Sequence, residues 1–378
     1  MKAMARFIGQ LWIAFGVALL LLLLLEQLVR AVLPVNARAQ FGAGTMPDRE
    51  RAAAVAADAW TGDYWREHEA ARHTRWRSYV YWRRQPFDGD LIDVDAHGFR
   101  VTPRVADAAH TIWLFGGSTA WGTGNRQIGT LAAALQMTLS ERGIRAQVLN
   151  FAESGYVSHQ SLQAFQLALR CGAEPSLAVF VDGANDVFAA YQRGVAGTPQ
   201  NESTRELEFL SSRQASRLLV AIGARFQGIA RLVQPAPVEF DATKLEQLAD
   251  AIASQYLSTV DQARAIAGAI PTVHRWQPTA FDLAVPKADE TDIVNASERD
   301  HVLLQRAATS RLLRRAPDIA VPLAPPGPVF FDFVHLSERG QQALAASMAD
   351  EIAQKLANAP AVRVARCENV PVMESDAR

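Results

Sequence analysis

Short apolar runs alternate with longer amphipathic segments from His110 onward, and this alternation constrains the fold more than any other feature of the chain. Apolar strands that alternate with helices are typical of a parallel sheet whose strands are joined by crossover helices. The sequence therefore predicts an α/β domain. Strands are expected at residues 111–116, 146–151, 177–182 and around 271–276, and helices near residues 127–143, near residues 158–171, and from the N-cap Ser337 to about Leu356.

Ser118 follows one of these apolar runs and two glycines, a sequence that exposes a nucleophile. A serine hydroxyl is a weak nucleophile at neutral pH, so it needs a base, and the base needs a third group to orient it. Asp332 and His335 supply such a pair, because three residues of separation on a turn let the carboxylate meet Nδ1 while Nε2 points towards Ser118. The sequence predicts a chain of nucleophile, base and orienter.

Attack of a serine on an acyl carbon creates an oxyanion, which needs hydrogen-bond donors aimed at it. Three candidates are the backbone N–H of Ser118, the backbone N–H of Gly155 and the side-chain amide of Asn185. Each residue follows the carboxyl end of an expected strand, where open α/β sheets bind their ligands. We therefore expect the three donors to meet at one edge of the sheet.

These motifs, taken together, resemble the SGNH, or GDSL-like, hydrolase superfamily of membrane-anchored bacterial type. Its four blocks, a Gly-x-Ser motif, a lone glycine, a Gly-x-Asn-Asp motif and an Asp-x-x-His motif, occur in order between about residues 110 and 345. The chain has Gly-Gly-Ser where many members have Gly-Asp-Ser. The resemblance implies a flavodoxin-like three-layer α/β/α sandwich and the same roles for Ser118, Gly155, Asn185, Asp332 and His335.

Two further residues are candidates for substrate binding, Gln277 and Trp121. Gln277 lies in a Gln-Pro turn after the expected fourth strand, and a purely structural turn explains it equally well. Aromatic and arginine residues are dense between residues 60 and 84. Two interpretations of this region remain open: its rings stack sugars or lie at a membrane surface, or they pack a small subdomain against the main one.

The run of residues 7–25 is apolar except for Gln10 and is long enough to cross a bilayer as a helix. Lys2 and Arg6 precede it, which favours an amino terminus inside and a periplasmic catalytic domain. We expect an uncleaved single-pass anchor. A cleaved signal peptide is the alternative, since residues 37–39, Ala-Arg-Ala, resemble a cleavage site.

The charge balance and motifs exclude other classes of partner. A formal net charge of -1 favours no nucleic acid. We expect no cofactor and no metal, because the histidines lack metal-ligand spacing and the segment Gly122-Thr123-Gly124 lacks a Walker lysine. Cys171 and Cys367 form a disulfide or stay as two thiols, and the sequence does not decide between these states.

The sequence predicts a membrane-anchored serine esterase that removes acyl groups, specifically O-acetyl groups, from an extracytoplasmic carbohydrate. Three alternatives remain: an O-acyltransferase with the same residues, a lipid esterase, and a non-catalytic carbohydrate-binding subunit of a polysaccharide export complex. The expected divisions of the chain are an anchor at residues 1–33, a tether and aromatic-rich subdomain at 34–105, a hydrolase domain at 106–360 with a helical insertion at about 187–268, and a tail at 361–378.

Overall fold

A computed structural model describes residues 2–32, 58–170, 172–206, 209, 238–283, 288–295, 297–321, 323 and 327–359. Several predicted features lie outside the described residues. They are residues 34–57 of the expected tether, residues 210–237 of the expected insertion, the tail at 361–378, Cys171 and Cys367. The chain divides into two units, which are considered separately. One unit comprises residues 1–41 and 201–238, and the other comprises residues 42–200 and 239–378.

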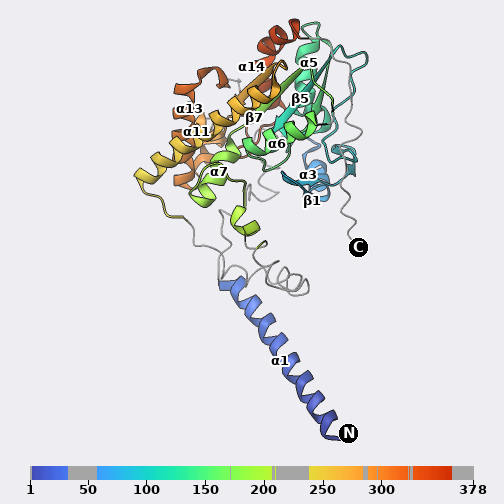
Figure 1. Cartoon of the computed structure of the whole chain (residues 1–378), viewed down its shortest axis with the longest axis vertical. Helices are drawn as coiled ribbons and strands as arrows, with labels where there is room; N and C mark the ends of the chain where they lie inside the picture. The colour runs from blue at the N-terminus through green and yellow to red at the C-terminus, as the bar shows by residue number, and fades with distance from the viewer. Residues whose placement is uncertain are drawn as a thin grey trace. The chain divides into compact units, whose positions relative to one another are not determined.

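Helix α1 (Lys2–Val32), blue in Figure 1, is the main element of the first unit. Within it, the segment Arg6–Val29 contains a window with a mean hydropathy of 2.5. Among the described residues it is the one helix long and apolar enough to cross a membrane. Length and composition suit a membrane anchor and a signal sequence alike, so the topology expected from the flanking charges stays a prediction.

Four parallel strands form the central sheet of the second unit, in the order β6-β5-β7-β8. This confirms the parallel sheet and the four strands that the sequence predicts. The chain order 2-1-3-4 across the sheet is that of a flavodoxin-like doubly wound fold. The strands are β5 (His110–Gly116), β6 (Ala146–Asn150), β7 (Leu177–Asp182) and β8 (Thr272–Trp276).

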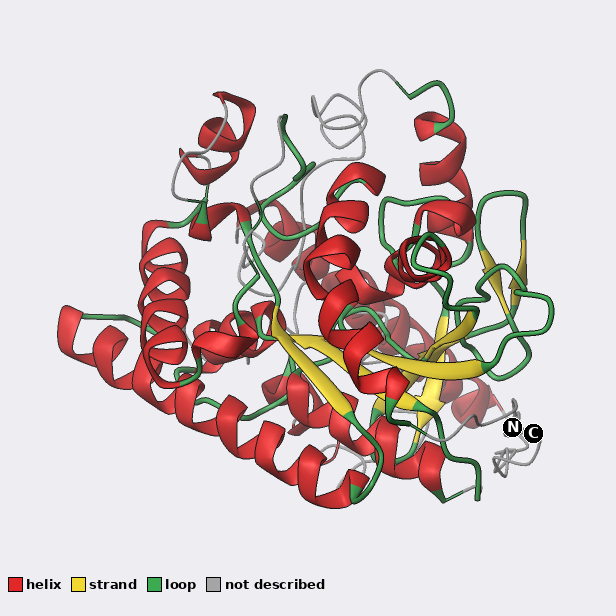
Figure 2. Cartoon of the chain, turned by 90° about the horizontal axis from the view of Figure 1, so that it is seen from above, coloured by secondary structure: helices red, strands yellow, loops and turns green. Residues whose placement is uncertain are grey.

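Helices cover both faces of this sheet, which gives the three-layer sandwich seen in Figure 2. On one face lie α5 (Leu131–Ser140) and α14 (Glu338–Ala357), and on the other lie α6 (Ser158–Leu169) and α11 (Ala242–Ala267). Ser337 caps α14 as expected, since its hydroxyl accepts the Gly340 N–H at 3.4 Å. Helix α11 falls within the expected insertion but packs on α6 and leads into β8, so it is a crossover helix of the sandwich.

The side chains of β5 show why its sequence is a continuous apolar run. Ile112 and Leu114 are buried in the core with α5 and α14, whereas Trp113 and Phe115 are buried in the core with α6. A strand covered on both faces buries every side chain and so lacks the alternation of a half-exposed strand. The strand therefore supports a rigid site at its carboxyl end.

Helix α7 (Ala184–Arg193) follows β7 and packs with α11 and α13 (Arg299–Arg315) in a third cluster that includes Trp276. Ahead of the sheet, a two-stranded hairpin joins β1 (Thr74–Arg77) and β2 (Tyr81–Arg84). The remaining elements are α3 (Thr61–Ala70), β3 (Phe87–Asp88), β4 (Asp93–Val94), α4 (Ser118–Trp121), α12 (Ala288–Asn295) and the short 3-10 helices Gln127–Gly129, Ala280–Asp282 and Pro317–Ile319.

The region rich in aromatic and arginine residues is in part structural. Tyr64 and Trp65 are buried in the same core as the helices α5 and α14. Arg83 and Arg84 are also buried, and their guanidinium groups donate to backbone carbonyls. For these side chains the packing interpretation is correct, whereas the ring of Trp76 is 67% exposed.

Candidate active site

Ser118 begins helix α4 directly after strand β5 and Gly117. Position 117 favours glycine because it lies close to the side chain of Asn185. A Cβ atom there would lie 2.3 Å from Nδ2 of Asn185. The Ser118 side chain is therefore presented at the carboxyl edge of the sheet, next to the Asn185 amide. Ser118 is 4% exposed.

Asp332 and His335 lie on the loop before α14 and meet Ser118. Oδ1 of Asp332 accepts the backbone N–H groups of Val334 at 3.0 Å and His335 at 2.7 Å, which fixes the carboxylate. Oδ2 lies 2.7 Å from Nδ1 of His335, and Nε2 of His335 lies 2.7 Å from Oγ of Ser118. When Nδ1 keeps its hydrogen and donates it to the carboxylate, Nε2 carries no hydrogen and can accept the serine proton. The structure thus joins the three residues in one hydrogen-bonded chain.

Asn185 is the second residue of α7, and its amide is oriented by two partners. Its Nδ2 donates to the carbonyl of Tyr156 at 2.7 Å, and its Oδ1 accepts from Nε2 of Gln200 at 3.0 Å. One Nδ2 hydrogen therefore remains for a ligand beside Ser118. Gln200 is not predictable from the sequence, because it lies in a polar segment with no motif that distinguishes it.

Gly155 lies in a tight turn after strand β6. The turn is closed by the N–H of Tyr156, which donates to the carbonyl of Glu153 at 3.2 Å. Gly155 has φ 83°, the left-handed conformation that a type II turn requires at this position. Within the described residues, the backbone N–H groups of Gly155 and Ser118 donate to no protein acceptor, so both are available to a bound oxyanion.

Asp186 supports the loop that presents Asn185. Its carboxylate accepts both the backbone N–H and the hydroxyl of Ser158, the first residue of α6. Burial raises the pKa of Asp186 to about 6, although the hydrogen bonds from Ser158 act to lower it. The contact ties the start of α7 to the start of α6.

Gln277, for which the sequence leaves substrate binding and a structural turn open, makes its hydrogen bonds within the protein. The side chain is 2% exposed, and its Nε2 donates to Oγ1 of Thr119 at 2.9 Å and to the carbonyl of Val334 at 3.2 Å. Both amide hydrogens are thus used inside the protein. Since Thr119 follows Ser118 and Val334 precedes His335, Gln277 connects the two segments that carry the hydrogen-bonded chain.

Trp121, the second candidate for substrate binding, is packed inside the protein. Its ring is completely buried, and the guanidinium carbons of Arg84 and Arg100 lie 4.0 Å and 4.4 Å from the ring centre. No surface of the indole is left for a ligand. The described residues also contain no group of three or more histidine, cysteine, aspartate or glutamate residues that could hold a metal ion.

Comparisons with known proteins found a matching family and similar solved structures. The family model described as GDSL-like Lipase/Acylhydrolase matches residues 112–348, more than half of the chain. Among solved structures, TesA is 17% identical, with 65% of this chain and 99% of that chain covered and a TM-score of 0.35. A lipase/acylhydrolase from Enterococcus faecalis is 13% identical (68% and 100% covered, TM-score 0.35), and the acetyl xylan esterase AlAXEase is 14% identical (64% and 99% covered, TM-score 0.32). No curated protein sequence matches the chain.

Proposed function

We propose a mechanism and a substrate class for this chain, which belongs to the GDSL-like lipase/acylhydrolase family and is a serine ester hydrolase. In the proposed mechanism Oγ of Ser118 attacks the acyl carbon of an ester while Nε2 of His335 takes its proton. Asp332 holds the imidazole in the required tautomer and stabilises the imidazolium. The observation that carries this proposal is the separation of 2.7 Å between Nε2 of His335 and Oγ of Ser118.

The negative charge that develops on the carbonyl oxygen is stabilised by the backbone N–H groups of Ser118 and Gly155 and by Nδ2 of Asn185. His335 then gives its proton to the leaving alcohol, and an acyl group stays on Ser118. A water molecule, deprotonated by His335, attacks this acyl-enzyme and releases the acid. The second tetrahedral intermediate uses the same three donors.

The proposed substrate is an O-acetylated carbohydrate outside the cytoplasm. An apolar helix at the amino terminus supports placement at a membrane, with the hydrolase domain on the extracytoplasmic side. The exposed ring of Trp76 stacks on Tyr81, with ring centres 5.5 Å apart, and offers an aromatic surface on which a sugar can pack.

A panel of esters tests the substrate class. The protein is expected to release acetate from an acetyl ester and from an acetylated polysaccharide faster than it releases palmitate from a long-chain ester. Ser118→Ala serves as the control for contaminating esterases. A preference for the long-chain ester would indicate that the substrate is a lipid and not a carbohydrate.

Transfer of the acyl group to a sugar hydroxyl is a second candidate, favoured by the burial of the site. Ser118 and His335 are 4% and 3% exposed, and limited access of water lengthens the life of an acyl-enzyme. Incubation with an acetyl donor and a deacetylated polysaccharide separates the two reactions. Acetyl groups that accumulate on the polysaccharide indicate transfer, and acetate that accumulates in solution indicates hydrolysis.

A further inference from the structure

The direction of the Gly155 N–H is set by a contact on the other side of the same peptide group. Nε1 of Trp82 donates to the carbonyl oxygen of Ser154 at 2.9 Å. The peptide between Ser154 and Gly155 is trans and planar, so its C=O and its N–H point in opposite directions. The indole therefore fixes the direction of the Gly155 N–H without touching it.

Resting on the function proposed above, we propose that Trp82 is a positioning residue that aims the Gly155 N–H at the oxyanion of the tetrahedral intermediate. Trp82 belongs to β2, which precedes the part of the chain that the family model matches. The hairpin of β1 and β2 is then a working part of the active site. Its rings serve catalysis through the backbone of the neighbouring turn.

The turn needs such a contact because its central peptide has two accessible orientations. Types I and II differ by a rotation of the peptide between the second and third residues, here Ser154 and Gly155. Glycine adopts both positive and negative φ, so this rotation is not blocked by a side chain. In the rotated form the Gly155 N–H would point away from the site. A donor on the Ser154 carbonyl selects the productive orientation.

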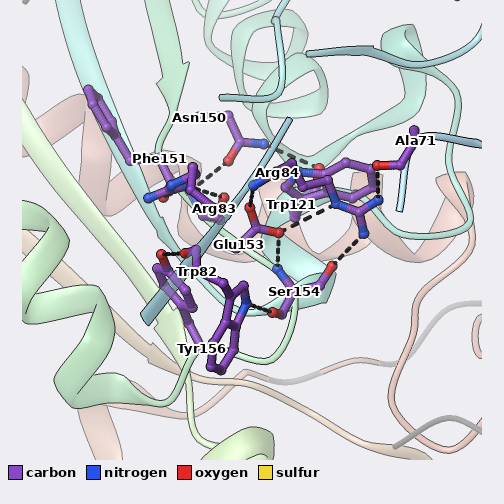
Figure 3. A network of polar contacts seen from close by, with 12 residues as sticks. Ala71, Trp82, Arg83, Arg84, Trp121, Asn150, Phe151, Glu153, Ser154 and Tyr156 are labelled. Carbon is purple, nitrogen blue, oxygen red and sulfur yellow. Dashed lines mark hydrogen bonds and ion pairs between the residues drawn. The ribbon is translucent and has the colours of Figure 1, made fainter. Parts of the chain in front are cut away.

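A network around Trp82 holds the turn in place, as Figure 3 shows. The buried carboxylate of Glu153 accepts the N–H of Ser154 at 2.8 Å and the backbone N–H of Arg84 at 2.9 Å. Nη2 of Arg84 donates to the hydroxyl of Ser154 at 3.1 Å. The hydroxyl of Tyr156 donates to the backbone carbonyl of Trp82. Two residues of β2, Trp82 and Arg84, are thus bonded to the turn.

The ring of Trp82 also packs directly on the turn. A Cβ atom at Gly155 would lie 3.2 Å from Cζ2 of Trp82, and the rings of Trp82 and Tyr156 meet edge to face with centres 5.6 Å apart. A phenylalanine at this position keeps most of this packing and removes only the N–H. Trp82→Phe is therefore a selective test of the hydrogen bond.

The test compares the steady-state kinetics of Trp82→Phe with those of the wild-type protein on an acetyl ester. A complete loss of one oxyanion donor costs on the order of 10² to 10³ in kcat, so partial misdirection of Gly155 should lower kcat by about 10- to 100-fold with little change in KM. The affinity for a boronic acid, which forms a tetrahedral adduct, should fall by a similar factor. Tyr79→Phe is the matched control, since Tyr79 is an exposed aromatic residue in the turn between β1 and β2, and it should keep the wild-type kcat.

Fluorophosphonate titration counts the active sites, so kcat is expressed per folded molecule. Should Trp82→Phe not fold, Tyr156→Phe removes the hydroxyl that holds the Trp82 carbonyl and should lower kcat by about 3- to 10-fold with KM unchanged. Wild-type kcat in the folded variant, or an equal loss in Tyr79→Phe, would overturn the positioning role. Activity that survives in Ser118→Ala would instead overturn the proposed function and the inference with it.

Discussion

The two sides of the active site are assembled in different ways. On the base side, Asp332 and His335 are three residues apart and are held by hydrogen bonds within one loop. On the donor side, Gly155 and Asn185 are oriented by residues from other parts of the chain, among them Trp82, which lies 72 positions from Ser154. The base side is therefore local, whereas the donor side depends on tertiary packing.

Because of this difference, substitutions on the two sides should have effects of different size. A change on the base side removes a reacting group, so its effect is large and independent of the rest of the fold. A change on the donor side alters the direction of a dipole, so its effect is smaller and passes through contacts such as that of Gln200 with Asn185. Three substitutions test this difference between the base side and the donor side.

The largest effect is expected for His335→Ala on the base side. Loss of the group that takes the serine proton should lower kcat by about 10⁴- to 10⁶-fold while substrate binding stays nearly constant. Steady-state kinetics on an acetyl ester measure the change. His159→Ala, at an exposed position of α6, is the control and should be fully active. A decrease in kcat of less than about 100-fold would show that another group acts as the base.

A smaller effect is expected for Asn185→Ala on the donor side. Loss of one oxyanion donor should lower kcat by about 10²- to 10³-fold with KM little changed. The same assay measures it, with Asn358→Ala at the exposed end of α14 as the control. If kcat falls as far as in His335→Ala, the two sides are not separable and the comparison fails.

The smallest effect on activity is expected for His274→Phe, which belongs to neither side. His274 stacks on Phe180 with ring centres 4.8 Å apart, and burial, assisted by nearby cationic side chains, lowers its pKa to about 3. In the unfolded chain the histidine takes up a proton near pH 6.5, whereas in the folded protein it stays neutral. Its contribution to stability is therefore present above pH 6.5 and is lost as pH falls towards 3.

Urea unfolding at pH 8 and pH 4.5 measures this contribution. His274→Phe should lose less free energy of unfolding than the wild-type protein between these two values, and its kcat at pH 8 should be unchanged. The variant thus separates acid loss of the fold from loss of the catalytic step. Equal losses of stability in both proteins would exclude His274 as a source of the acid sensitivity.

Much of the fold follows from the sequence because the central strands β5 and β7 are buried on both faces and consist mostly of apolar residues. The hydrogen-bonded chain was also predictable, since Asp332 and His335 interact locally. The roles of Trp82 and Gln200 were not predictable, because they depend on contacts between segments far apart in the chain. The buried positions of Gln277 and Trp121 were not predictable, because the direction of a side chain after a strand is set by packing. The domain boundaries stay a prediction.

The most direct measurement is the site of reaction with a fluorophosphonate, located by mass spectrometry of the digested protein. The account predicts one adduct per chain, on Ser118, that is absent in Ser118→Ala and forms far more slowly in His335→Ala. An adduct on a different serine, or hydrolysis of the ester by a folded protein that takes up no label, would contradict it.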